Sequence, residues 1–287
     1  SPRSARMGPR ISHLLLAILA REPAIQKILS IVPERIGVHF KPQLANDEHS
    51  RHLAVLYRDN PHSQLQPGEM AVPVGSLFAI DQHGQPLLRQ WVRLSQGKDD
   101  AAAMLAFFHE YAAISVPALL GMYLRYGVAF EAHQQNSFMV MAADGQLSRL
   151  LLRDFGDIRI DRKTLHAHGL DIELHDPKMT LYDDAGFVRD KLLHTVFMCH
   201  LGELILLAAR HFDIPQALLW DELSAQVSQC FDDLRSQVDP QRWATEREAL
   251  LEHAWPAKSF MRMRLLESHA DIVGRLPNPL SAAANAD

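Results

Sequence analysis

Apolar residues recur with helical spacing near the start of the chain and again near its middle. Residues 11–31 place them on one face and predict an amphipathic helix that is interrupted at Pro23. A second helix is predicted from Ala101 towards Tyr126, because two aspartates precede it and can cap its first turn. Pro117 lies inside this segment, so we expect a kink or a break there.

The chain after residue 188 is dominated by helical patterns. Residues 190–212 are very apolar, which predicts a central helix. Pro215 stands where the first residue of a helix is favoured, and it predicts a further helix through about Gln237. One or two more helices are expected within residues 246–273.

Short apolar runs separated by Pro, Gly and Asn predict strands in the first part of the chain. The clearest pair is residues 137–141 and 147–152, joined by Asp144 and Gly145, because an Asp-Gly pair between two apolar runs favours a β-hairpin. Three further strands are expected at residues 52–59, 74–80 and 87–94.

The order of these elements predicts an α+β fold in two parts. Residues 1–188 would form a domain of strands and helices that carries the hairpin, and residues 189–287 would form a helical domain. A chain of 287 residues is long enough for one large domain or two ordinary ones.

Composition and charge narrow the possible partners. Hydrophobic residues make up 47% and charged residues 22%, as in ordinary globular proteins, and the net charge of -5 favours no nucleic-acid partner. The longest uncharged stretch, residues 111–124, is shorter than the roughly 20 residues of a membrane span.

Cys199 and Cys230 lie far apart and are expected to be buried thiols in a reducing cytoplasm. The chain opens at Ser1 without an initiator Met or a secretory leader, which suggests a portion of something longer.

The hairpin has polar residues at its open end. EAHQQN, residues 131–136, precedes the first strand, and RDFGD, residues 153–157, follows the second. Since a hairpin brings these two ends together, we expect the side chains of Asn136 and Asp154 to converge. An amide oxygen beside a carboxylate oxygen suits Mg²⁺, which usually also binds substrate phosphates.

The same order of parts occurs in kinases: a His-containing loop that ends in Asn, a hairpin, and Asp-Phe-Gly. Gln135 stands where a kinase has its catalytic Asp, and no glycine-rich phosphate loop occurs upstream. An amide cannot take a proton from a hydroxyl nucleophile, so the hairpin is expected to serve another reaction. A kinase-like phosphotransferase stays as the alternative enzyme, and a non-catalytic binding module as the alternative from another class.

The segments GVAFEAHQQNSFMVM and LLLRDFGD resemble the aerobactin-type siderophore synthetases, the IucA/IucC family of NRPS-independent enzymes. SPRSARMGPRISHLL at the start, PAKSFMRMRLLES from Pro256 and PNPL from Pro277 agree with this resemblance, which covers roughly residues 1–280. It implies a ligase that uses ATP and Mg²⁺ to adenylate a carboxylate, typically of citrate or a succinyl group. An amine, hydroxylamine or alcohol then captures the acyl-adenylate during siderophore biosynthesis, and members that join hydroxamate units have the most similar opening.

The resemblance also implies a cupped-hand architecture of fingers, palm and thumb. This chain would supply an antiparallel-sheet palm with helices and a helical thumb, in a cytoplasmic enzyme that is expected to be a homodimer. The family's Ser-x-Arg-Thr motif and a further ATP-binding Lys belong to an N-terminal half that should precede Ser1. That half is therefore an expected partner of this chain.

The resemblance assigns the carboxylate side of the reaction to the EAHQQN loop and to the region after Pro256. His133 would contact the carboxylate and stabilise charge as the acyl-adenylate forms, with Glu131 beside it in the catalytic site. Lys258 and Arg262 would reach the substrate carboxylates.

The resemblance assigns ATP binding to the residues before the first strand and after the second strand of the hairpin. Gln135, Asn136, Arg153 and Asp154 are the expected ATP contacts. Asn136 and Asp154, together with Glu131, are the expected metal ligands.

Two other interpretations concern single residues of the apolar helix and the cysteines. His200 and Glu203 share a helix face, and we expect a hydrogen-bonded core feature there rather than a metal site. The family's C-terminal region is also related in name to ferric-siderophore reductases, which need four cysteines for an iron–sulfur cluster. Two distant cysteines cannot supply it, so redox chemistry is not expected.

Overall fold

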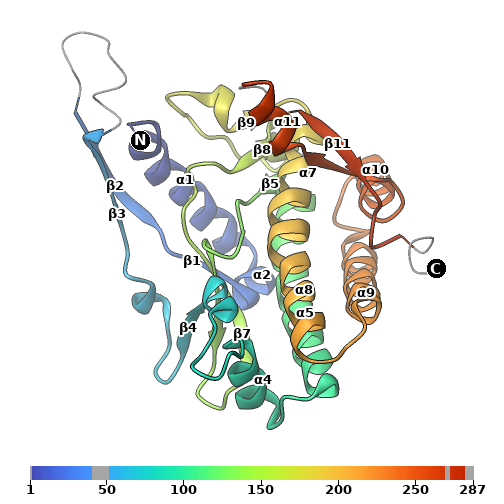
Figure 1. Cartoon of the computed structure of the whole chain (residues 1–287). Coiled ribbons are helices and arrows are strands. Elements are labelled where there is room, and N and C mark those ends of the chain that lie inside the picture. Colours follow the sequence, from blue (N-terminus) through green and yellow to red (C-terminus); the bar gives the residue numbers. More distant parts are fainter. Residues whose placement is uncertain (1, 41–51, 269–271, 282–287) are drawn as a thin grey trace.

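Figure 1 shows the computed structural model of the chain, which describes residues 2–40, 52–268 and 272–281. The predicted α+β fold is confirmed. The sheet that contains the hairpin lies left of the centre of this view, and the helices of the later part of the chain lie to its right.

The chain begins with two helices and a strand. α1 (Pro2–Arg21) and α2 (Pro23–Ile28) meet at Pro23, a residue that favours the first turn of a helix. β1 (Leu29–Ile31) follows directly, so the helix predicted over 11–31 begins earlier and ends earlier than expected. The last three residues are extended because they pair in parallel with a strand of the hairpin.

The predicted hairpin is confirmed and lies at the centre of a four-stranded sheet. β6 (Ser137–Met141) and β7 (Leu147–Leu152) are antiparallel, with Phe138 opposite Leu151. β4 (Met70–Pro73) pairs with β6, and β1 pairs with β7, which gives the order β1-β7-β6-β4. The β1–β7 pair is parallel and the other two pairs are antiparallel.

Smaller sheets lie around this one. β2 (Glu34–His39) and β3 (Ala54–Arg58) form a two-stranded ribbon, and β3 confirms the strand predicted over 52–59. β5 (Val128–Ala129), β8 (Arg159–Asp161) and β9 (Leu181–Tyr182) form a three-stranded sheet. β10 (Trp255–Lys258) and β11 (Val273–Leu276) form a two-stranded sheet.

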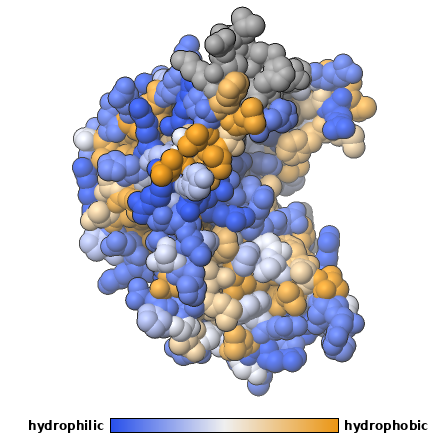
Figure 2. Space-filling model, turned by 90° about the vertical axis from the view of Figure 1, so that its left-hand side faces the viewer, coloured by the Kyte–Doolittle hydropathy of each residue, from blue (hydrophilic) through white to orange (hydrophobic). Residues whose placement is uncertain are grey.

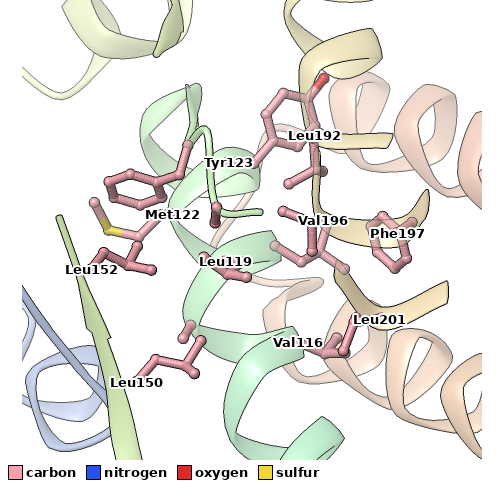
Figure 3. Close-up of a cluster of buried hydrophobic side chains, with 14 of the residues drawn as sticks. Val116, Leu119, Met122, Tyr123, Leu150, Leu152, Leu192, Val196, Phe197 and Leu201 are labelled. Atoms are coloured by element: carbon pink, nitrogen blue, oxygen red, sulfur yellow. The ribbon is translucent and has the colours of Figure 1, made fainter. Parts of the chain in front are cut away.

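α5 (Ala101–Tyr126) crosses the middle of the molecule. Asp100 caps it by accepting a hydrogen bond from the Ala103 backbone N, and Gly127 ends it with a left-handed φ of 71°. The helix runs through Pro117 without a break. Figure 3 shows its apolar side chains between β7 on one side and the helical run after residue 185 on the other.

The predicted apolar helix is confirmed as one helical run with an unusual middle. α7 (Ala185–Leu192) leads into a π-helix (Leu193–Gly202), and α8 (Glu203–His211) completes the run. Hydrogen bonds in a π-helix span five residues instead of four, so each turn is wider than in an α-helix. Val196 and Leu201 of this segment lie towards α5 (Figure 3).

The remaining helices complete the chain. The helix expected after Pro215 is α9 (Gln216–Leu234), and α10 (Pro240–Leu251) and α11 (Phe260–Leu265) correspond to the helices expected near the end. The β10–β11 pair lies in the part predicted to be helical, which is therefore not helical throughout. A short helix in the first part is α6 (Arg162–Ala167).

Two predicted strands were wrong. Residues Val74–Phe78 form a 3₁₀ helix, and α4 (Leu88–Gln96) occupies the other predicted strand. α4 buries Leu88 and Val92, four residues apart, and Gly97 closes it with a φ of 72°. So short an apolar run does not distinguish one helix face from a buried strand.

Two helical runs, Ala101–Tyr126 and Ala185–His211, are long and apolar enough to cross a membrane by length and composition alone. The sequence analysis looked for membrane spans among uncharged stretches, and it missed both helices because each contains isolated charged residues. More than half of each apolar window is buried inside the protein, as in the core helices of a globular protein.

The boundary predicted between residues 188 and 189 falls inside α7. One hydrophobic core cluster contains residues from both sides of it, among them Leu119 of α5 and Leu204 of α8. The division into two domains stays a prediction.

Candidate active site

The loop before β6 carries the EAHQQN residues and is fixed by Asn136. The buried side chain of Asn136 donates from Nδ2 to the Glu131 carbonyl oxygen at 3.1 Å, and its backbone N donates to the His133 carbonyl at 3.0 Å. The Asn136 carbonyl in turn accepts from the Arg153 backbone N, just after β7, at 3.0 Å. The backbone thus joins the two strand ends, as expected, while the convergence of the Asn136 and Asp154 side chains stays a prediction.

Two residues of the π-helix hold the other side of this loop. Thr195 Oγ1 donates to the Phe130 carbonyl at 2.9 Å, and His200 Nδ1 bonds to the Ala132 carbonyl at 2.8 Å. Residues five apart lie on different faces of an α-helix with 3.6 residues per turn, but on nearly the same face of a π-helix. The π-helix therefore lets both side chains reach one loop.

His200 is fully buried, and its hydrogen bonds fix its tautomer. A carbonyl oxygen can only accept, so Nδ1 carries the proton toward Ala132 and Nε2 accepts from the Tyr111 hydroxyl at 2.5 Å. Burial lowers the pKa of His200 to about 4, a net result in which the bond to Ala132 opposes the shift and the nearby His133 adds to it. The expected hydrogen-bonded core feature is confirmed for His200, whereas Glu203, expected to share it, is exposed.

Replacing His200 by Gln should flatten the acid side of the stability profile. The pKa of His200 lies near 6.5 in the unfolded chain, so between that value and about 4 the unfolded state binds more protons than the folded state. His200 therefore costs no stability above that window, and stability falls as the pH is lowered through it. We expect wild type to lose about 2 kcal/mol more than His200→Gln between about pH 7.5 and pH 5, measured by urea unfolding at both pH values. His13→Gln, at an exposed histidine of α1, serves as the control and should keep the wild-type slope.

Lys191 of α7 joins two acidic side chains at the edge of the loop. Its Nζ lies 2.9 Å from Glu131 Oε1 and 2.8 Å from Asp157 Oδ2, while the Lys191 side chain is only 8% exposed. A lysine this deeply buried is stable as a cation only with such partners. Asp157 also lies 3.8 Å from Arg3, so the cluster links the loop to both α7 and α1.

Asp154, just after β7, has an unusual backbone conformation. Its φ of 65° lies in the left-handed region, which Asp tolerates better than most residues and which is common at functional sites. Its carboxylate forms an ion pair with Arg58 of β3 at 2.8 Å, and Arg58 also bonds to Glu34 of β2 at 2.9 Å. Burial raises the pKa of Glu34, while Arg58 acts in the opposite direction.

A pocket of about 330 Å³ is lined by residues of the loop, of the helical run and of the β10–β11 pair. Three predicted site residues line it, namely Glu131, His133 and Lys258. Arg159 and Lys191 add two more basic side chains to its wall. A larger hollow of about 500 Å³ is lined by residues of α6 and α10 and includes none of the predicted site residues.

The other predicted site residues lie outside this pocket. Asn136 and Asp154 are at the open end of the hairpin, and Gln135 is exposed there. The Arg153 guanidinium lies 5.3 Å from the centre of the Phe138 ring. Arg262 is exposed on α11.

Two basic residues of the pocket were missed by the sequence analysis. Lys191 left a usable signal, because a lysine near the start of a very apolar helix needs a partner. Arg159 gave no such signal in the sequence. Its Nη1 donates to the Phe187 carbonyl at 2.6 Å, and its guanidinium lies 3.6 Å from the centre of the Phe187 ring. Both contacts depend on the tertiary fold.

The predicted metal ligands are not gathered as a protein-only site. Within the described residues no group of three His, Cys, Asp or Glu side chains could hold a metal ion. Glu131 contacts Lys191, and Asp154 contacts Arg58. Mg²⁺ at a nucleotide site often has one or two protein carboxylates plus phosphates and water, so the metal assignment stays a prediction.

Comparisons with known proteins concern the family and the fold of the chain. Residues 1–79 match the sequence model described as "IucA / IucC family", and residues 105–272 match the one described as "Ferric iron reductase FhuF-like transporter". The chain is 36% identical, over 98% of its length, to "Uncharacterized protein y4xN" of Sinorhizobium fredii and covers 46% of that protein. It is 25% identical, over 72% of its length, to the D-ornithine–citrate ligase of Staphylococcus aureus and covers 33% of it.

Solved structures show the same fold. The petrobactin biosynthesis protein AsbB of Bacillus anthracis superposes with a TM-score of 0.81 at 18% identity, over 98% of this chain and 47% of that one. ATP-bound aerobactin synthetase IucA of Klebsiella pneumoniae gives 0.75 at 19% identity, over 98% and 49%. The chain belongs to the IucA/IucC family, whose model matches residues 1–79, and, through residues 105–272, to the FhuF-like family. It spans about half the length or less of these relatives.

The predicted IucA/IucC family is confirmed, but its model matches residues 1–79, whereas the EAHQQN and RDFGD segments that suggested it lie within the FhuF-like match. Named relatives include a D-ornithine–citrate ligase, an aerobactin synthase and a rhizobactin siderophore biosynthesis protein. The chain's two cysteines are fewer than the four thiolates of an iron–sulfur cluster, and the expected lack of redox chemistry stays a prediction. Burial raises the pKa of both Cys199 and Cys230, which is typical of unreactive thiols.

Proposed function

We propose that this chain is part of an ATP-dependent siderophore synthetase of the acyl-adenylate-forming kind. A carboxylate oxygen of the substrate attacks the α-phosphorus of ATP, and pyrophosphate leaves. An amine, hydroxylamine or alcohol then attacks the acyl carbon, and AMP leaves as the amide or ester forms. The similarity to a D-ornithine–citrate ligase supports citrate or a related carboxylate as the substrate.

The observation that carries the proposal is the pocket that joins His133 to several basic side chains. Lys191, Lys258 and Arg159 supply cationic groups that can bind the carboxylates of a di- or tricarboxylate, beside the acidic side chains of Glu131, Asp157 and Asp190 in the same wall. His133 can donate a hydrogen bond to the reacting carboxylate and stabilise charge that develops there. Lys191 also holds Glu131 in place, so the loop presents His133 in a fixed orientation.

ATP and Mg²⁺ fit best at the open end of the hairpin. Asn136 and Asp154 supply the amide and carboxylate oxygens that a hard cation prefers, and Gln135 and Arg153 lie close to them in the chain. Bound Mg²⁺ would neutralise charge on the phosphates during transfer. The ATP-bound aerobactin synthetase, which has the same fold, supports a nucleotide site in such a chain.

Product analysis tests this proposal. We expect this chain, combined with the half that its relatives carry in addition, to convert ATP into AMP and pyrophosphate only when a di- or tricarboxylate is present. The chain alone should show little turnover, because an ATP triphosphate needs more cationic and amide donors than the Asn136–Asp154 end of the hairpin supplies. Formation of ADP would favour the kinase-like alternative, and no turnover by the combined halves would favour a binding module.

The cellular setting belongs to the same proposal. A cytoplasmic homodimer with small-molecule substrates, and without nucleic-acid or membrane partners, agrees with the net charge of -5 and with the burial of the long apolar helices.

A further inference from the structure

The ribbon formed by β2 and β3 has an apolar face that no described residue covers. Six side chains share this face, and each is between 48% and 59% exposed. They are Ile36, Val38 and Phe40 from one strand and its extension, and Leu53, Val55 and Tyr57 from the other. We call these six side chains the ribbon face.

The register of the two strands places these side chains in cross-strand pairs. Ile36 lies opposite Tyr57 and Val38 opposite Val55, while a backbone hydrogen bond of 2.8 Å joins Phe40 to Leu53. Figure 2 views the side on which β2 and β3 lie in Figure 1, and it shows hydrophobic residues gathered on this surface. The ribbon face is therefore one contiguous patch.

The opposite face of the ribbon is already packed against α1. A Cβ atom at Gly37 would lie 1.7 Å from the Ala5 carbonyl oxygen, so the two backbones are in direct contact. The Glu34 backbone N, which is buried, donates to Ser12 Oγ at 2.9 Å. A ribbon with one packed face normally turns polar side chains to water on the other, whereas the outward face of this ribbon is apolar.

The size of the ribbon face also favours a partner. Six large side chains, each about half exposed, present on the order of 500 Å² of apolar surface, near the upper limit for the largest patch of a monomeric protein. Patches of this size commonly mark an interface.

We infer that the ribbon face is covered by the part of the longer synthetase that this chain does not include, and that this part meets it with an apolar sheet or helix face. The inference rests on the proposed function. The chain accounts for 47% and 49% of the two solved structures whose fold it shares, so about as much chain again has to pack on it. The ribbon lies within residues 1–79, the segment that matches the IucA/IucC model.

The position of α1 supports this occupant over a second copy of the chain. α1 begins at Pro2, and its first turns pack on β2 through the Ala5–Gly37 contact. Any chain that leads into α1 has to arrive beside the ribbon (Figure 1). A preceding segment can therefore cover the ribbon face without a long connection.

Thiol labelling at the centre of the ribbon face tests the inference. Val55→Cys would be prepared in the 287-residue chain and in the chain extended by the additional half, with Leu218→Cys on α9 as the matched control because Leu218 is similarly exposed, at 47%. We expect a maleimide to modify Cys at 55 at least tenfold more slowly in the extended protein, at every protein concentration. Labelling at 218 should be the same in both proteins.

The other outcomes overturn the inference. Slow labelling at 55 in the 287-residue chain itself, increasing with dilution, would show that a second copy covers the ribbon face. Fast labelling at 55 in both proteins would show that nothing covers it. The readout needs no ATP or substrate, so a failed AMP assay beside protection at 55 would overturn the proposed function and leave the interface standing.

Discussion

The Asp154→Asn variant of the complete synthetase should form AMP about 100-fold more slowly than the wild type, because removing one charge from a site that stabilises transferring phosphates typically costs this much. Asn is the appropriate replacement, since Asp154 has a φ of 65° and Asn tolerates this region. The assay is carboxylate-dependent pyrophosphate release at limiting Mg²⁺. The loss should become smaller as Mg²⁺ is raised, if the carboxylate is a metal ligand.

The matched control lies at the other end of the same hairpin. Asp144→Asn changes a turn residue whose Oδ1 accepts from the Gln146 backbone N, a bond that Asn can also accept. It should leave AMP formation unchanged, and circular dichroism should show both variants folded. Near-normal activity of Asp154→Asn at limiting Mg²⁺ would remove Asp154 from the metal site.

The Lys191→Met variant should lose both stability and substrate affinity. It removes the cation that lies between Glu131 and Asp157, so Glu131 loses this ion pair and Asp157 keeps, among the described residues, only its 3.8 Å contact with Arg3. Breaking a fully buried ion pair costs about 3–5 kcal/mol, and because Asp157 is 59% exposed we expect about 2 kcal/mol here. The KM for the carboxylate should rise at least tenfold, as the pocket loses a positive charge.

Lys163→Met serves as the control for Lys191→Met, since Lys163 is exposed on α6. Urea unfolding should show a change of less than about 0.5 kcal/mol for this control. Adding Glu131→Gln to Lys191→Met should recover part of the lost stability, because the uncompensated charge is then removed. Equal stability of the two lysine variants would show that the Lys191 ion pairs contribute little.

The hairpin and its loop could be predicted from the sequence because their signals are local. Asp144 and Gly145 specify the turn, and the polar residues that adjoin both strands meet because antiparallel pairing brings strand ends together. The same is true of Asp100 and Gly127, since each caps an end of α5 through contacts with residues only a few positions away. Such signals depend on the backbone geometry of a short segment and survive in any tertiary context.

The partners of the predicted residues could not be derived in this way. Arg58 reaches Asp154 across 96 positions of sequence, and Lys191 reaches Glu131 across 60. No periodicity encodes such distances, which depend on how whole elements pack. α4 was misread for a related reason, since its eight-residue apolar run gains its helical character from burial of one face.

The π-helix determines how many residues separate Thr195 and His200, the two side chains that anchor the loop. Deleting a single residue between Thr195 and His200 would let the segment return to α-helical hydrogen bonding, because the wide turn accommodates one extra residue. Thr195 and His200 would then lie four residues apart, which places both on one face of an α-helix, so both can still bond to the loop. Homologues without the wide turn should therefore show a one-residue gap between these two positions and keep both the threonine and the histidine.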